Sequence, residues 1–276
     1  MRIDIVSLFP EFFDAFFSHS IIKRAIEAER LSMDVTNPRD FSHNKHGQVD
    51  DTPYGGGAGM LMMAPPIFET VESVIAQYDS DINSAYSTDE LCDEMSLIGN
   101  PSENIRRRVI FMGPTGQPFT QEKARELATY DQLVLICGHY EGVDYRVEEH
   151  LVDETISIGD YVLTGGELPA MVVADAVARM IPGVLGAASG AHEDSFYEPL
   201  LECPQYTKPP EFRGWGVPDV LRSGHHKNIA TWRQKEALKR TRLLRPDLLE
   251  RPLTKEEVKL LKEIIAEESE RDKGEV

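Results

Sequence analysis

The order of apolar and polar residues predicts an α/β fold for the first two thirds of the chain. Residues 2–9 alternate in the way that is typical of a half-buried strand. Apolar strand-like runs follow at residues 109–112, 133–138 and 155–163, and segments with helical periodicity separate them. Such alternation predicts a parallel sheet covered by helices, with a ligand at the carboxyl ends of the strands.

The amino-terminal part of the pattern is less regular. We expect a helix at about residues 12–29, a second strand, a glycine-rich loop at residues 55–59 and a short amphipathic helix at residues 67–78. Residues 79–106 are polar, acidic and poor in periodic apolar positions. We interpret them as a partly disordered surface insertion.

A second, mostly helical region follows a linker. Residues 186–195 are small and polar, and helices are expected at residues 228–239 and 254–271. Thr254 is a good N-cap, and Glu257 three residues later completes a capping box. The sequence therefore predicts a first domain of residues 1–185, a linker of residues 186–195 and a small helical domain of residues 196–276.

Each of the three later strand-like runs ends in a glycine-containing turn, which we call an elbow. The first run leads into Gly113-Pro-Thr-Gly116, and the second ends at Gly138 before residues 139–144. The third leads into Gly165-Gly166, and Glu167 then begins a helix. Because glycines before a helix expose backbone N–H groups to a ligand, the three elbows predict three walls of one small-molecule pocket.

Composition bounds the class of protein. The chain has 276 residues, of which 41% are hydrophobic, enough for a core. Its amino terminus lacks the pattern of a signal peptide, and its most apolar stretch, residues 170–188, carries Asp175 and Arg179. Three separated cysteines fit a reducing compartment and predict neither a disulfide framework nor a metal site. We expect a cytoplasmic protein that is not in the membrane.

Charge is distributed unevenly. The net charge of −18 argues against a nucleic-acid partner, and residues 69–103 contain nine acidic residues and no Lys or Arg. Residues 222–245, which we call the basic stretch, instead carry eight basic residues and one acidic residue. Such a run is often only a solvated face, but phosphate binding depends on the local patch and not on the overall charge.

The glycine-rich loop Gly55-Gly-Gly-Ala-Gly59 does not have a dinucleotide-binding spacing. Met60 stands where the last glycine of Gly-x-Gly-x-x-Gly would fall, and the chain has no P-loop lysine motif. An oxidoreductase of the nucleotide-binding α/β type therefore lacks its fingerprint. A flexible turn remains the simple interpretation of this loop.

Several motifs outside the elbows are long and distinctive. They are Pro38–Phe41, Val49–Gly57, Ile181–Gly186, Glu193–Phe196 and Cys203–Pro209. Together with the elbows, from Ile5 to about Leu253, they resemble the bacterial tRNA (guanine-N(1)-)-methyltransferase family, TrmD. The resemblance implies a SPOUT methyltransferase fold with a deep trefoil knot at the ligand pocket. It also implies methyl transfer from S-adenosylmethionine to ring nitrogen 1 of guanosine 37 of tRNA, next to the anticodon.

The resemblance implies which residues bind the methyl donor. Phe111 stands where a tyrosine is expected, which removes a hydroxyl contact but keeps an apolar wall. The implied donor-binding residues are Phe111, Met112, Gly113, Pro114, Gly138, Tyr140, Glu141, Gly142, Ser157, Ile158, Gly159, Tyr161, Val162, Leu163, Gly165 and Gly166.

The resemblance also implies the catalytic pair. Guanine must lose the proton on its ring nitrogen, and Asp194 is the implied base. Arg179 is implied to hold the guanine carbonyl oxygen, where negative charge develops. Taken alone, an Asp in a polar linker is usually a cap or a solvated side chain. A non-catalytic RNA-binding module with the same fold would not need both residues.

RNA binding and assembly are further implications. The RNA-facing residues are Asp50, Tyr54, Glu202, Arg233, Lys239 and Arg240, and Glu202 stands where an aspartate is expected. The resemblance implies a homodimer in which each active site takes residues from both chains, with no membrane partner. It also makes Mg²⁺ a possible cofactor, but no ligand cluster in the sequence identifies its site.

Overall fold

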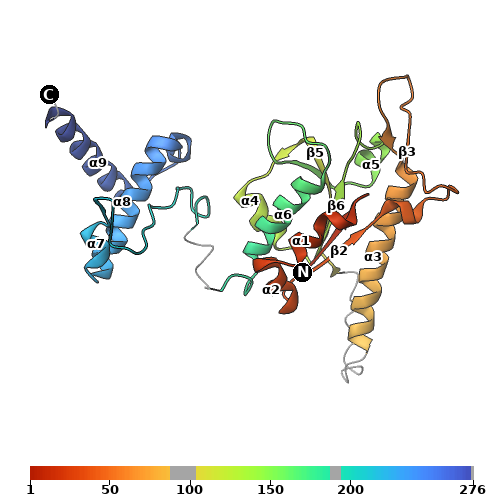
Figure 1. Ribbon diagram of the computed structural model, residues 1–276, viewed down its shortest axis with the longest axis horizontal. Coiled ribbons are helices and arrows are strands. Elements are labelled where there is room, and N and C mark those ends of the chain that lie inside the picture. Colours follow the sequence, from red (N-terminus) through yellow and green to blue (C-terminus); the bar gives the residue numbers. More distant parts are fainter. Residues whose placement is uncertain (88–103, 187–193, 275–276) are drawn as a thin grey trace. The chain divides into compact units, whose positions relative to one another are not determined.

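The computed structural model describes residues 1–87, 104–186 and 194–274, in two compact units, Met1–Ala188 and Ser189–Val276. The first unit is built on a parallel sheet with the strand order β2-β1-β6-β5-β7 (Figure 1). Its strands are β1 (Arg2–Val6), β2 (Ser32–Thr36), β5 (Arg107–Pro118), β6 (Gln132–Cys137) and β7 (Glu154–Ser157). The α/β class and the parallel sheet predicted from the sequence are confirmed.

Helices cover both faces of this sheet. Successive residues of β6 point to opposite faces, so Leu133 and Leu135 join one hydrophobic cluster while Val134 and Ile136 join the other. The first cluster lies against α2 (Ser20–Glu27), α4 (Gln121–Leu127) and α6 (Glu167–Met180), and the second against α3 (Ala64–Ser87) and α5 (Tyr145–His150). Figure 1 shows α3 on the other side of the strands from α6. A sheet buried on both faces explains why its strands read as continuous apolar runs.

The helix expected at residues 12–29 is interrupted. The structure has a 3-10 turn, η1 (Pro10–Phe13), then α1 (Asp14–Phe17) and then α2. Ser20 adopts a positive φ of 54°, and the Ser18 hydroxyl donates to the carbonyl of Asp14 at 2.7 Å. Serine hydroxyls compete with the helix for backbone partners in this way. The apolar periodicity runs across the break, so the sequence pattern did not reveal it.

The helix expected at residues 67–78 is much longer, because α3 continues to Ser87. The first nine residues of the expected surface insertion, residues 79–87, are therefore helical, and residues 88–103 lie outside the described part of the chain. Polar side chains hold this end of α3 to the amino-terminal edge of the sheet. Asp81 pairs with Arg2 at 3.3 Å, and Asp79 pairs with Arg107.

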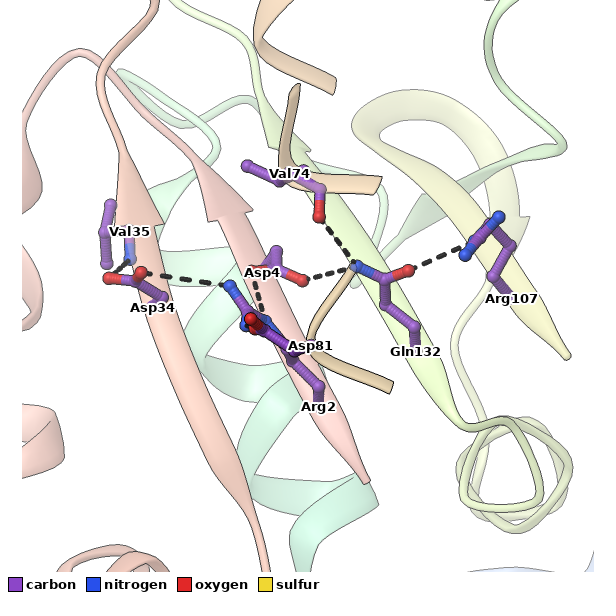
Figure 2. A network of polar contacts seen from close by, with 8 residues as sticks. All are labelled: Arg2, Asp4, Asp34, Val35, Val74, Asp81, Arg107 and Gln132. Atoms are coloured by element: carbon purple, nitrogen blue, oxygen red, sulfur yellow. Dashed lines mark hydrogen bonds and ion pairs between the residues drawn. The ribbon is translucent and has the colours of Figure 1, made fainter. Parts of the chain in front are cut away.

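A buried polar network continues from these ion pairs into the sheet (Figure 2). Asp4 is 1% exposed and accepts hydrogen bonds from Arg2 at 2.8 Å and from the Gln132 amide at 2.7 Å. Arg107 donates to the other end of the Gln132 amide at 3.1 Å. Burial raises the pKa of the Asp4 carboxyl, against the lowering effect of its donors. The network satisfies polar groups that would be costly to bury alone.

The third apolar run is only partly a strand. β7 ends at Ser157, so the expectation of a strand that continues to residue 163 is wrong. Tyr161 and Val162 are 55% and 84% exposed, and the Tyr161 amide donates to the carbonyl of Gly159 at 2.9 Å. The apolar residues after β7 form a loop, in which Ile158 packs against the core while Tyr161, Val162 and Leu163 remain exposed.

The described residues of the second unit form α-helices, a 3-10 helix and a small hairpin. The Thr254 amide donates to Glu257 at 2.7 Å and the Glu257 amide donates to the Thr254 hydroxyl at 3.2 Å, so the predicted capping box is confirmed. Leu238 and Ile264 form the center of its core. Its elements are α7 (Asp219–Arg222), α8 (His226–Leu244), η5 (Pro246–Leu249), α9 (Lys255–Gly274), β8 (Glu211–Phe212) and β9 (Trp215–Gly216).

Candidate active site

A cavity of about 150 Å³ lies beside an irregular part of β5 and the carboxyl ends of β6 and β7. All of the donor-binding residues implied by the sequence line this cavity, including every glycine of the three elbows that was assigned to it. Four lining residues were not assigned to donor binding from the sequence: His139, Ile156, Thr164 and Pro169. The cavity lies at the position where ligands bind open parallel sheets.

Glycine backbone forms much of the wall because side chains do not fit there. A Cβ at Gly113 or Gly138 would lie 2.8 or 2.9 Å from the Phe111 ring. A Cβ at Gly166 would lie 2.6 Å from the Cα of Cys137. The amide of Gly166 donates to the carbonyl of Gly138 at 2.9 Å, which joins the second and third elbows. The second and third elbows are therefore held side by side directly before α6 begins.

The first elbow is an excursion within one strand. Met112 and Gln117 both pair with Ile156, so β5 leaves the sheet between them and returns to the same partner. Gly116 makes the return possible, because a Cβ there would lie 2.4 Å from the carbonyl of Thr155. Residues 113–116 are thus displaced toward the cavity, where Gly113 and Pro114 line it.

The second elbow is held in a sparsely populated backbone conformation. Tyr140 has a φ of 59°, in the left-handed region that non-glycine residues seldom adopt, and Gly142 has a φ of 125°. The amide of Glu141 donates to the carbonyl of Met60 at 3.0 Å, which ties the elbow to the end of the glycine-rich loop. Two short strands near this loop, β3 (Asp50–Asp51) and β4 (Leu61–Met62), pair with each other. The end of the glycine-rich loop therefore lies against Glu141, which itself lines the cavity.

The third elbow carries an apolar rim. Ser157 stabilises its first turn, since its hydroxyl donates to the Gly159 carbonyl at 3.0 Å and accepts from the Gly159 amide at 3.2 Å. Val162 and Leu163 follow and remain 84% and 37% exposed. Exposed apolar residues beside a cavity are typical of a binding surface for a flat apolar group.

A buried polar chain lies behind the second and third elbows. Glu167 is 4% exposed, and its carboxylate accepts a hydrogen bond from Ser7 at 2.7 Å and one from Nε2 of His139 at 3.0 Å. Because a carboxylate only accepts, Nε2 of His139 carries the proton. The three residues are far apart in the sequence, so no local pattern could have revealed this chain.

The residues implied for catalysis and RNA binding are placed in both units. Arg179 lies in the last turn of α6, whereas Asp194 belongs to the second unit. There Asp194, Glu202 and Arg233 line a second cavity of about 330 Å³, against α8. The remaining positions are dispersed: Asp50 is in β3, Tyr54 is fully exposed in a loop, and Lys239 and Arg240 are partly exposed on α8.

In residues 1–87, 104–186 and 194–274, no group of three or more His, Cys, Asp or Glu side chains could hold a metal ion. No helix in the described part of the chain is both long and apolar enough to span a membrane.

The fold and the cavity together define an α/β protein with a cavity lined by glycine elbows at the carboxyl edge of its parallel sheet. The family model described as tRNA (Guanine-1)-methyltransferase TrmD matches residues 1–251. A curated tRNA (guanine-N(1)-)-methyltransferase of Desulforamulus reducens is 54% identical over 96% of this chain and 95% of its own length. Relatives of the same name from Brevibacillus brevis and Dehalococcoides mccartyi are 53% and 50% identical, over 96% and 98% of this chain and 98% and 99% of theirs. The chain belongs to the TrmD family.

Proposed function

We propose that this chain is an enzyme that methylates ring nitrogen 1 of guanosine in tRNA, at position 37, with S-adenosylmethionine as the methyl donor. The observation that carries the proposal is the cavity, because its lining includes every residue implied for donor binding. The relatives that cover nearly the whole chain carry the name tRNA (guanine-N(1)-)-methyltransferase, which supports the reaction and the tRNA substrate. Position 37 and the donor follow from the family.

The lining fits the proposed donor. Gly113, Gly138 and Gly166 line the cavity without a side chain, because a Cβ at any of them would collide with Phe111 or with the backbone of Cys137. Tyr161 and the neighbouring apolar residues would hold the adenine, and Glu141 offers a carboxylate to hydroxyl or ammonium groups. When bound, the donor would supply an electrophilic methyl group.

The protein's own contribution is to remove a proton and to stabilise charge. Asp194 would accept the proton from guanine N1, and Arg179 would donate to the guanine oxygen as negative charge develops on it. The ordinary pKa of an aspartate is about 3.9, so proton transfer to Asp194 requires a short distance and exclusion of water. The carboxylate and the guanidinium therefore act as a pair on the two sides of one guanine edge.

We also propose a homodimer with composite sites, a deep trefoil knot around the cavity, a cytoplasmic location and tRNA contacts along the basic stretch. Arg179 and Asp194 belong to different compact units, which is compatible with a site that takes one from each chain. A twofold dimer would make both sites composite. α6 presents Leu168 and Val172 about half exposed, which supports a protein partner there. Mg²⁺ is kept as a possible cofactor without an assigned site.

The proposal is tested by incubating the chain with labelled methyl donor and tRNA transcripts and then mapping the methylated base. Label at N1 of guanosine 37 supports it, and no transfer under single-turnover conditions would favour the alternative, a non-catalytic RNA-binding module. Mixing Arg179→Ala chains with Asp194→Ala chains tests the composite site. Activity should return on subunit exchange, because one site of each heterodimer is intact. Heterodimers without activity would exclude this arrangement.

A further inference from the structure

The Ser7–Glu167–His139 chain places a buried negative charge next to the donor cavity. Among the described residues that line the cavity there is no lysine or arginine, and the acidic side chain in the lining is that of Glu141. Glu167 lies just behind the lining with 4% exposure. Only His139 could offset these two carboxylates from within the lining.

Two polar side chains and the start of a helix face the Glu167 carboxylate. Glu167 is the first residue of α6, a helix of 14 residues, so the positive end of the helix dipole lies beside its carboxylate. The Ser7 hydroxyl and the His139 ring both donate to it. At the end of β6, burial raises the pKa of the Cys137 thiol. The charge of Glu167 raises the same pKa to a smaller extent.

The carboxylate is separated from the cavity by little more than glycine backbone. The position of a Cβ on Gly165, which lines the cavity, lies 2.4 Å from Oε2 of Glu167 and 2.3 Å from Nε2 of His139. No side chain at that glycine shields the charge. A ligand group against Gly165 would therefore meet the field of Glu167 across a medium of low polarisability, where Coulomb interactions are stronger than in water.

We propose that Glu167 makes this cavity selective for a cationic methyl donor over its neutral product. The inference rests on the proposed function, because it takes a sulfonium compound as the ligand. When the methyl group leaves, the electron pair of its bond remains on sulfur, so the positive sulfonium becomes a neutral thioether. A fixed carboxylate attracts the first form and not the second. Glu167 thereby weakens product inhibition while it strengthens donor binding, and His139 positions its carboxylate.

Calorimetry with three probes tests this role. S-adenosylmethionine, S-adenosylhomocysteine and a donor analogue with an ammonium-bearing carbon in place of the sulfonium are titrated into the full chain at about pH 8. We expect Glu167→Gln to weaken both cationic probes about tenfold and the neutral product less than about twofold. Equal losses for all three probes, or no loss, would overturn the proposal.

Two further variants sharpen the result. His139→Arg retains a donor for Glu167 but sets a permanent positive charge against it, so the donor-to-product affinity ratio should fall by a similar factor even if Glu167→Gln does not fold. Glu122→Gln removes an exposed carboxylate on α4 that does not line the cavity, and its affinity ratio should equal that of the parent. An unchanged ratio in His139→Arg would count against Glu167. If the parent itself bound no donor, the proposed function would fail instead.

Discussion

Replacing Gly166 by alanine should impair both the fold and the cavity, for one geometrical reason. The new Cβ would lie 2.6 Å from the Cα of Cys137 and 2.9 Å from the amide nitrogen of Gly138. Both are backbone atoms at the end of a buried strand, so neither can rotate away as a side chain would. Raising the shorter contact from 2.6 Å to an ordinary 3.4 Å requires the start of α6 to move by about 0.8 Å. That movement would break the hydrogen bond from Gly166 to Gly138.

Overpacking of this kind costs about 1–3 kcal/mol. For a unit of this size each kcal/mol lowers Tm by about 2–4 °C, so scanning calorimetry of Gly166→Ala should show Tm lower by about 2–12 °C. Donor affinity should fall more than about tenfold, because the displaced helix start and its neighbour Gly165 both line the cavity. Titration calorimetry measures that loss below the transition, where the variant is folded.

Gly186→Ala is the matched control in the same unit. No atom lies within 4 Å of its Cβ position, and its φ is outside the left-handed region. Its Tm and donor affinity should equal those of the parent. Parent-like values in Gly166→Ala as well would refute the argument that backbone contact at the third elbow excludes a side chain.

Three other predictions concern features elsewhere in the chain. The Arg251 hydrogen bond lowers the pKa of Glu257 to about 2, so this carboxylate stabilises the second unit above its ordinary pKa of 4.5, and the stabilisation is lost as pH falls from about 4.5 to 2. Glu257→Gln should remove that acid dependence from urea unfolding curves. Gln132→Leu takes a donor from the buried Asp4 and should lower the free energy of unfolding by about 1–3 kcal/mol, whereas an unchanged midpoint would make the network dispensable. If the basic stretch binds tRNA phosphates, triple alanine substitution at Arg233, Lys239 and Arg240 should weaken binding and reduce the salt slope by up to about 0.9 for each phosphate that is no longer neutralised.

The glycines of the elbows could be predicted from the sequence because each effect is local. A strand that ends in Gly138 or in Gly165-Gly166 before a helix signal can be recognised from neighbouring residues alone. These glycines do line one cavity. The apolar residues at 158–163 led to the wrong prediction of a strand. A loop that presents apolar side chains to a cavity can have the same composition as a strand. Composition does not distinguish burial by protein from exposure beside a binding site.

Long-range partners could not be predicted. Glu167 lies 160 residues from Ser7 and 28 from His139, and only the fold brings them within hydrogen-bond distance. The length of α3 was missed for a related reason. The polar residues near its end, including Asp79 and Asp81, resemble a solvated loop until their arginine partners on the sheet are known.

The glycine walls of the cavity also determine how the protein can respond to an inhibitor. Resistance to a competitive inhibitor commonly arises when a larger side chain intrudes on the inhibitor and spares the natural ligand. At Gly113, Gly138 and Gly166 that route is closed, because any side chain first collides with Phe111 or with the backbone of Cys137. A compound that draws its affinity from these three backbone surfaces would face few escape substitutions. A compound that relies on the exposed rim at Val162 would face many.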